Sequence, residues 1–194
     1  MKRSLVILNL ALVAALAIGA FGGSRAVAAE FHAGAAPITL TGTPTNHRLA
    51  FNAGAMTCTT ITLTGEMPVV TTKQITLKPD FKQCTVFGFP NVTVDVNECD
   101  FLFTATGEMH IICPANKAIE LTAPFCTVKI KAQNGLNATA IASNAGKTDF
   151  KFTTNIGGIA YDECGTPRVN GTYTGSTTVT GANAMKTPID VWFE

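Results

Sequence analysis

Alternating apolar and polar residues mark the middle of the chain, between Asn97 and Cys113. Apolar side chains recur at every second position on both sides of the tripeptide 105–107. A period of two indicates strands with one buried face, so this stretch predicts a β-hairpin. Gly107 suits the left-handed conformation that ends a three-residue hairpin turn. The predicted apolar face consists of Cys99, Phe101, Phe103, Met109, Ile111 and Cys113.

Folding this hairpin about Thr106 places Cys99 directly opposite Cys113. Opposed residues of an antiparallel pair have Cβ atoms about 4.5–5.5 Å apart, which a small adjustment brings within reach of a disulfide. We therefore predict a Cys99–Cys113 bond. The alternative is a pair of free cysteines in the core.

The other four cysteines occur in two similar segments that flank the hairpin. In each segment a cysteine and a threonine begin a strand-like run, and an aromatic residue, two polar residues and a second cysteine follow later. Similar substructures would pair their cysteines alike, which favours Cys58–Cys84 and Cys126–Cys164. Coincidence between two short matches is the alternative. An even number of cysteines in an exported chain indicates a disulfide framework.

Threonine, valine and isoleucine recur between turn residues along the rest of the chain, and such β-branched residues favour strands. No segment after the N-terminal region has helical periodicity. We expect strands at 38–41, 47–51, 57–63, 69–77, 92–96, 118–122, 127–131, 138–142, 149–155, 172–180 and 189–193. We expect turns that include Gly65, Pro68, Pro79-Asp80, Asn134-Gly135, Gly157-Gly158 and Asn170-Gly171.

Many short strands at this spacing predict an all-β fold, an antiparallel sandwich or a barrel-like domain over residues 30–194. The single tryptophan, Trp192, lies at the C-terminal end, so the antibody-type sandwich is not predicted. An aromatic residue near the C-terminus can also mark an outer-membrane barrel. The expected strands are shorter than the roughly ten residues that such barrels need.

Residues 1–29 have the layout of a secretory signal peptide. Lys2 and Arg3 precede an apolar run from 5 to 21, and small residues follow at 26–29. An uncleaved membrane anchor is the alternative, but Asn9 interrupts the run and a span needs about 20 apolar residues. We expect a signal-peptide helix, cleavage near Ala29, and a secreted product with no integral membrane span.

Cleavage changes the charge balance of the chain. The 14 basic and 13 acidic residues give a net charge of +1, and removal of Lys2, Arg3 and Arg25 leaves 11 basic residues and a net charge of −2. No basic stripe occurs, so the sequence offers no electrostatic footprint for nucleic acid. The expected partner is an unknown extracellular or cell-surface molecule.

Groups for catalysis or metal binding are sparse in the mature chain. The histidines are His32, in an expected flexible N-terminus, His47, and His110, across the hairpin from Leu102. None has a metal-ligand spacing to another histidine or to a cysteine, and we expect His110 to be structural. No nucleophile elbow or phosphate-binding glycine loop occurs.

The carboxylates give no recognisable catalytic or metal-binding pattern. A pair for glycoside hydrolysis could come from Glu66, Glu108, Glu120, Asp149 and Asp162-Glu163, but their spacing is uninformative, and we expect them to be solvated turn residues. The segment 95–100 is rich in oxygen donors but lacks the glycine and distant glutamate of a calcium loop. Three glycosylation sequons begin at Asn91, Asn137 and Asn170 and have meaning only in a host with the machinery.

These observations favour an exported, non-enzymatic β-domain that binds a partner or forms part of a surface, without a cofactor. The alternatives are a carrier of a small apolar ligand in a barrel cavity and a hydrolase whose site the sequence does not reveal. A cavity of several hundred cubic ångströms would favour the carrier. Carboxylates or His110 converging in one pocket would favour catalysis.

Overall fold

The structure, a computed structural model, describes residues 28–137 and 139–194, so the predicted signal peptide lies almost entirely outside the described residues. In this described part, no helix is long and apolar enough to cross a membrane. The strands are β1 Phe31–Ala33, β2 Ile38–Phe51, β3 Gly54–Met67, β4 Thr71–Thr72, β5 Gln74–Val86, β6 Phe89–Asp95, β7 Asp100–Thr104, β8 Glu108–Ile112, β9 Ala118–Ala123, β10 Cys126–Lys131, β11 Gln133–Asn137, β12 Thr139–Ser143, β13 Phe150–Glu163, β14 Thr166–Ala182, β15 Pro188–Ile189 and β16 Val191–Phe193.

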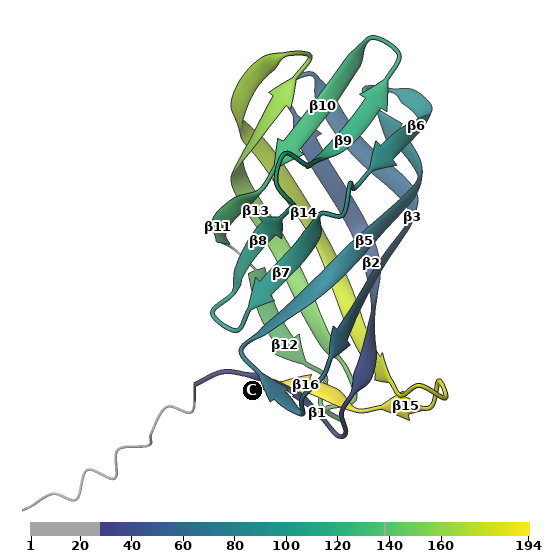
Figure 1. Cartoon of the computed structure of the whole chain (residues 1–194), viewed down its shortest axis with the longest axis vertical. Helices are drawn as coiled ribbons and strands as arrows, with labels where there is room; N and C mark the ends of the chain where they lie inside the picture. Colours follow the sequence, from purple (N-terminus) through teal and green to yellow (C-terminus); the bar gives the residue numbers. More distant parts are fainter. Residues whose placement is uncertain (1–27, 138) are drawn as a thin grey trace, which may run out of the picture.

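Eight of these strands close into an antiparallel barrel (Figure 1). The order around the barrel is β5-β3-β2-β14-β13-β10-β9-β6, and pairing of β6 with β5 closes the ring. Each neighbouring pair is antiparallel. The all-β prediction is therefore confirmed, and of the two expected architectures the chain adopts the barrel.

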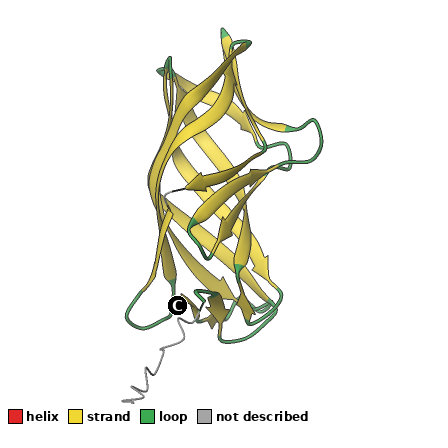
Figure 2. Ribbon diagram, turned by 90° about the vertical axis from the view of Figure 1, so that its left-hand side faces the viewer, coloured by secondary structure: helices red, strands yellow, loops and turns green. Residues whose placement is uncertain are grey.

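One wall of the barrel consists of long strands and the opposite wall of short ones in two tiers. The first half of β5 pairs with β7, which continues to β8 and β11. The second half of β5 pairs with β6, which continues to β9 and β10. Figure 2 shows the two tiers crossing the long strands.

Apolar side chains fill the interior because they occupy alternate positions along each strand. In β14, Tyr173 and Val179 are buried while Thr172, Thr174 and Thr180 are exposed. These outward positions of β14 are therefore threonines, and these inward positions are apolar. Phe103 stacks on Phe152 with ring centroids 4.2 Å apart, which fixes the central hairpin to β13.

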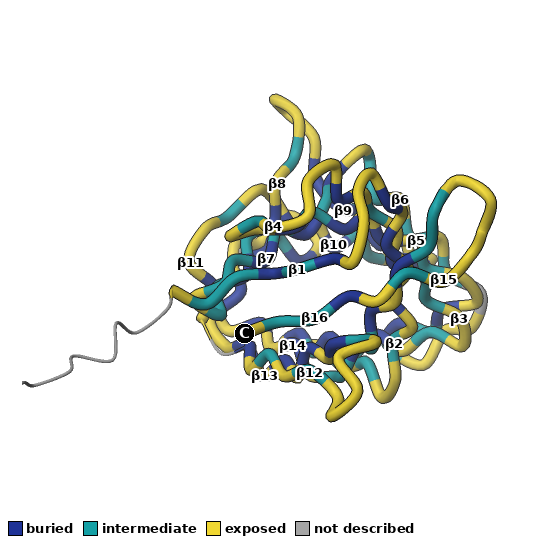
Figure 3. The backbone as a smooth tube through the Cα atoms, turned by 90° about the horizontal axis from the view of Figure 1, so that it is seen from below, coloured by how far each residue is buried: buried dark blue, intermediate teal, exposed yellow. Residues whose placement is uncertain are grey.

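A separate sheet of β16, β1 and β4 lies across one end of the barrel (Figure 3). Phe31 of β1 is fully buried there. Its ring centroid lies 5.4 Å from that of Phe150 and 5.2 Å from that of Phe193. Backbone hydrogen bonds join Glu30 to Glu194, so the two ends of the described chain meet at this capped end.

The central hairpin has the predicted register. Phe101 pairs with Ile111 and Phe103 with Met109, and Gly107 has φ +84° in the turn. The structure contains all three predicted disulfides, Cys58–Cys84, Cys99–Cys113 and Cys126–Cys164. The two bonds expected from the repeated segments each connect neighbouring antiparallel strands. Cys58 faces Cys84 across β3 and β5. Cys126 begins β10, and Cys164 directly follows β13.

Several predicted turns lie inside long strands instead. Gly65 is within β3, where a Cβ would stand 2.3 Å from the carbonyl oxygen of Thr76, so the glycine permits close approach of two strands. Pro79 is within β5, opposite Leu63. Gly157-Gly158 lie at an irregularity of β13, and Asn170-Gly171 lie in β14. Sequences typical of turns here accommodate the bends and contacts of a barrel wall.

Two strands were not expected. The segment around His32, predicted to be flexible, forms β1, and the expected turn at Asn134-Gly135 is a bulge within β11. Both strands are short, and both pair with residues distant in sequence. Local alternation cannot reveal such pairing, because the partner strand supplies the stabilisation.

Candidate functional site

Four two-residue turns form the end of the barrel opposite the capping sheet, hereafter the distal end, at the top of Figure 1. The residues that flank each turn are paired across neighbouring strands. The turns are 52–53, 87–88, 124–125 and 164–165.

Hydrogen bonds and a disulfide hold these turns in place. The Tyr161 hydroxyl accepts the N–H of Asn52 at 2.8 Å, and the buried Glu163 carboxylate accepts the N–H of Ala53 at 3.0 Å. Cys164 bonds to Cys126, so the disulfide ties the β13–β14 turn to the beginning of β10. The distal end is therefore constrained by covalent and polar links.

Two phenylalanines project from this end into solvent. Phe125 is 88% exposed and Phe89 is 39% exposed, and their ring centroids are 6.1 Å apart. Pro124 fits the first central position of a β-turn, which leaves Phe125 at the tip, outside the alternation of either strand. Large apolar side chains at a constrained turn indicate a contact surface, because nothing in the described chain covers them.

An open groove of about 710 Å³ runs from this tip along β10. Lys129, Lys131 and Asp162 line it, and the same three residues line an adjoining groove of about 230 Å³ with Arg168. Glu120 accepts a hydrogen bond from Lys129 at 2.9 Å, which raises the pKa of the lysine. Lys131 has no ion-pair partner among the described residues. Arg168 Nε lies 3.8 Å from the Glu163 carboxylate, so two of the three basic side chains are paired and Lys131 is the cation that these grooves leave unpaired among the described residues.

We call Phe89, Phe125, Lys129, Lys131 and Arg168 the distal patch. None of them was singled out from the sequence. The sequence feature that could have revealed the distal patch is the Pro124-Phe125 pair, which lies between two expected strands and directly before a cysteine.

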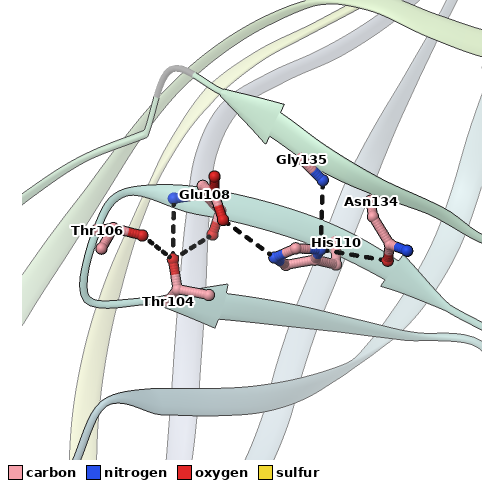
Figure 4. A network of polar contacts seen from close by, with 6 residues as sticks. All are labelled: Thr104, Thr106, Glu108, His110, Asn134 and Gly135. Atoms are coloured by element: carbon pink, nitrogen blue, oxygen red, sulfur yellow. Dashed lines mark hydrogen bonds and ion pairs between the residues drawn. The ribbon is translucent and has the colours of Figure 1, made fainter.

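His110 lies on the outer face of β8 in a polar network (Figure 4). It pairs with Leu102 as predicted, and its side chain is 17% exposed. Nε2 is 3.6 Å from Glu108 Oε2, and Nδ1 is 3.2 Å from Asn134 Oδ1. The N–H of Gly135 donates to the same Nδ1 at 3.3 Å. Both ring nitrogens therefore contact groups of this chain.

His47 is half-buried and contacts Tyr173. Its Nδ1 forms a short hydrogen bond with the Tyr173 hydroxyl, and its Nε2 is 2.8 Å from the carbonyl oxygen of Ser176. Burial lowers the pKa of His47, and the Ser176 carbonyl opposes this shift. Burial also raises the pKa of Tyr173 far above its usual value, so the phenol stays protonated.

The remaining candidates take part in local structure. The His32 ring stacks on Trp192 with centroids 5.2 Å apart. In the segment 95–100, Asp95 accepts the N–H of Asn97, and Asn97 donates to the Ala118 carbonyl. Among the described residues, no group of three or more His, Cys, Asp or Glu side chains could hold a metal ion.

A small apolar cavity of about 30 Å³ lies in the barrel interior, lined by residues such as Phe81, Phe101 and Tyr173. Small-molecule sites have volumes of roughly 300–1,000 Å³. This cavity is about tenfold smaller than such a site.

Comparisons with protein-family models, with curated proteins and with solved structures found no match for this chain.

Proposed function

We propose that the protein is an exported, non-enzymatic binding module that contacts an acidic protein on a cell surface through the distal patch. The exposure of Phe125 at a turn next to a disulfide is the observation that carries this proposal. Aromatic and arginine side chains are enriched in protein interfaces and supply much of their binding energy.

Charge supports the choice of an acidic partner. The mature chain would carry a net charge of −2, yet Lys131 lines both grooves beside Phe125 and has no ion-pair partner among the described residues, whereas Lys129 and Arg168 are paired with Glu120 and Glu163. A cation without a partner beside exposed aromatic rings favours a protein that brings a carboxylate to this end.

Export is part of the same proposal. Three disulfides are consistent with an oxidising compartment, since cytosolic thiols are kept reduced. The layout of residues 1–29 supports secretion. A carrier is not proposed, because the cavity of about 30 Å³ is too small for a ligand of ordinary size.

Binding of the fluorescently labelled mature protein to intact cells of the producing organism tests the proposal. We expect retention on the cells to fall roughly tenfold or more in the Phe89→Ser/Phe125→Ser variant, because an aromatic anchor contributes about 2 kcal/mol or more. Added salt should weaken retention, and protease treatment of the cells should abolish it.

Val69 and Val70 provide the matched control. They are 51% and 52% exposed and lie near the capped end. The Val69→Ser/Val70→Ser variant should bind like the wild type. Equal retention of the Phe89→Ser/Phe125→Ser variant and the wild type would contradict the proposal, and so would retention that survives protease treatment.

A further inference from the structure

The bulge in β11 brings an Asn-Gly pair against one histidine. Gln133 pairs with Ile111 and Leu136 with Met109, so Asn134 and Gly135 together oppose His110 of β8. The extra residue of a bulge re-aims neighbouring side chains. Gly135 has φ +67°, which a residue with a side chain rarely adopts.

One neutral tautomer of His110 fits the contacts of its ring. A proton on Nε2 points toward Glu108 Oε2 at 3.6 Å, and the Nδ1 lone pair then accepts the N–H of Gly135 at 3.3 Å. A carboxylate behind a histidine fixes this tautomer and stabilises the cation that forms when Nδ1 takes up a proton. The Gly135 nitrogen and the Glu108 carboxylate thus contact different nitrogens of the His110 ring, as Figure 4 shows.

We propose that Asn134 is a self-modification site, at which His110 catalyses deamidation through a succinimide formed with Gly135. The two reacting residues are adjacent, so the step is intramolecular and benefits from proximity. Glycine offers no side chain to hinder the attacking nitrogen. Nothing lies within 4 Å of the position that a Gly135 Cβ would occupy, so water can reach the ring that forms.

The proposed step balances without an added reagent. The Gly135 nitrogen attacks Cγ of Asn134 while its proton moves to Nδ1 of His110. Negative charge develops on Asn134 Oδ1, 3.2 Å from the nitrogen that has just been protonated. This contact becomes a hydrogen bond only as charge forms, so it stabilises the transition state more than the ground state.

Collapse of the intermediate breaks the Cγ–Nδ2 bond. His110 returns the proton to Nδ2, and ammonia leaves. Water then opens the succinimide at either carbonyl carbon, which yields aspartate or isoaspartate at position 134. His110 ends the cycle in its starting form and acts as general base and then general acid.

The chain contains a second Asn-Gly pair that serves as an internal control. Asn170 Oδ1 accepts a hydrogen bond from the Tyr161 hydroxyl at 2.9 Å. Gly171 is buried, and its Cβ position lies 3.0 Å from the carbonyl oxygen of Ile159. No histidine contact to this pair occurs among the described residues. We infer that Asn170 retains its amide while Asn134 reacts.

Incubation of the folded, full mature protein at neutral pH, followed by peptide mapping with mass spectrometry, tests the proposal. Conversion at Asn134 should be roughly tenfold or more faster than at Asn170, and the two rates should become similar in denaturant. His110→Gln should slow conversion at Asn134 by about 100-fold, the lower range for a lost general base. Glu108→Gln should slow it less.

His47→Gln is the control for the loss of a histidine elsewhere and should leave the rate at Asn134 unchanged. Conversion of the His110→Gln variant at the wild-type rate would overturn the proposal. If that variant does not fold, the comparison of Asn134 with Asn170 in the wild type and the rate in Glu108→Gln remain decisive. Equal rates at the two asparagines in the folded protein would refute it.

Discussion

At the scale of single residues, the environment of His47 changes the pKa of its ring. Its side chain is half-buried, and its ring contacts the hydroxyl of Tyr173, the carbonyl of Ser176 and the hydroxyl of Thr177. Burial lowers its pKa from the ordinary 6.5, so the folded protein favours the neutral ring. The unfolded chain takes up this proton at a higher pH than the folded chain does. Stability therefore decreases as the pH falls below about 6.5.

We predict that the free energy of unfolding is lower at pH 5 than at pH 7.5, with a slope below about 1.4 kcal/mol per pH unit, the limit for one proton. His47→Gln should flatten this dependence. Urea denaturation across this pH range measures it, with His32→Gln as the control. Tyr173 does not titrate in this window because burial raises its pKa. Asp100, whose pKa is also raised by burial, contributes with the opposite sign at more acidic pH. An unchanged slope in His47→Gln would contradict the prediction.

At the scale of elements, β1 has only three residues but anchors the capping sheet. Phe31 is fully buried among Phe150, Phe152 and Phe193. A short strand with two hydrogen-bonded neighbours gains little from its own propensity. Its stability therefore depends on this aromatic contact.

We predict that Phe31→Ala lowers the free energy of unfolding by about 3–5 kcal/mol, the usual cost of deleting a buried phenylalanine ring. Phe125→Ala removes the same atoms from an exposed position and should change stability by less than about 0.5 kcal/mol. Chemical denaturation of the two variants gives the comparison. Similar losses in both would show that the capping sheet does not depend on the Phe31 contact.

Local signals explain which elements the sequence could predict. The hairpin 97–113 carries its alternation, its turn glycine and its cysteines within one stretch, so its register and its disulfide could be predicted. The strands β1 and β11 pair with segments distant in sequence, and no local pattern marks them. Pro79 and Gly65 resemble turn residues but lie within β5 and β3, because a barrel needs such residues where strands bend or approach closely.

At the scale of the whole molecule, the disulfides join strands that are already neighbours in the barrel. The cysteine pairs are separated by 14, 26 and 38 residues in sequence. Each bond stabilises the fold by about 3–4 kcal/mol in the loop-entropy treatment, which is large against a typical net stability of roughly 5–15 kcal/mol.

We predict that the protein isolated from the medium begins at Ala29 or Glu30 and carries three intramolecular bonds. Mass spectrometry before and after reduction reports both properties. Reduction should lower the urea midpoint or unfold the protein, because the unfolded chain then regains the entropy that the bonds remove. Free thiols in the isolated protein, or a chain that retains residues 1–29, would contradict export to an oxidising compartment.

Barrel closure and the distal patch were beyond prediction for related reasons. Closure depends on the pairing of the second half of β5 with β6, although the first half of the same strand pairs with β7. Phe125 and Phe89 project from turns or strand ends, where no hydrophobic period distinguishes an exposed aromatic from a buried one. The outward threonines, in contrast, follow directly from strand alternation.

The meeting of Glu30 and Glu194 beside β1 and β16 sets how the molecule can be presented. A tether or fusion partner joined at residue 30 or at residue 194 would extend from the capped end, leaving Phe125 and the lysines of β10 at the opposite end, directed away from the point of attachment. Because residues 30 and 194 are adjacent, a short linker could connect them. New ends opened in an exposed turn outside the distal patch would then give a permuted barrel that keeps this patch.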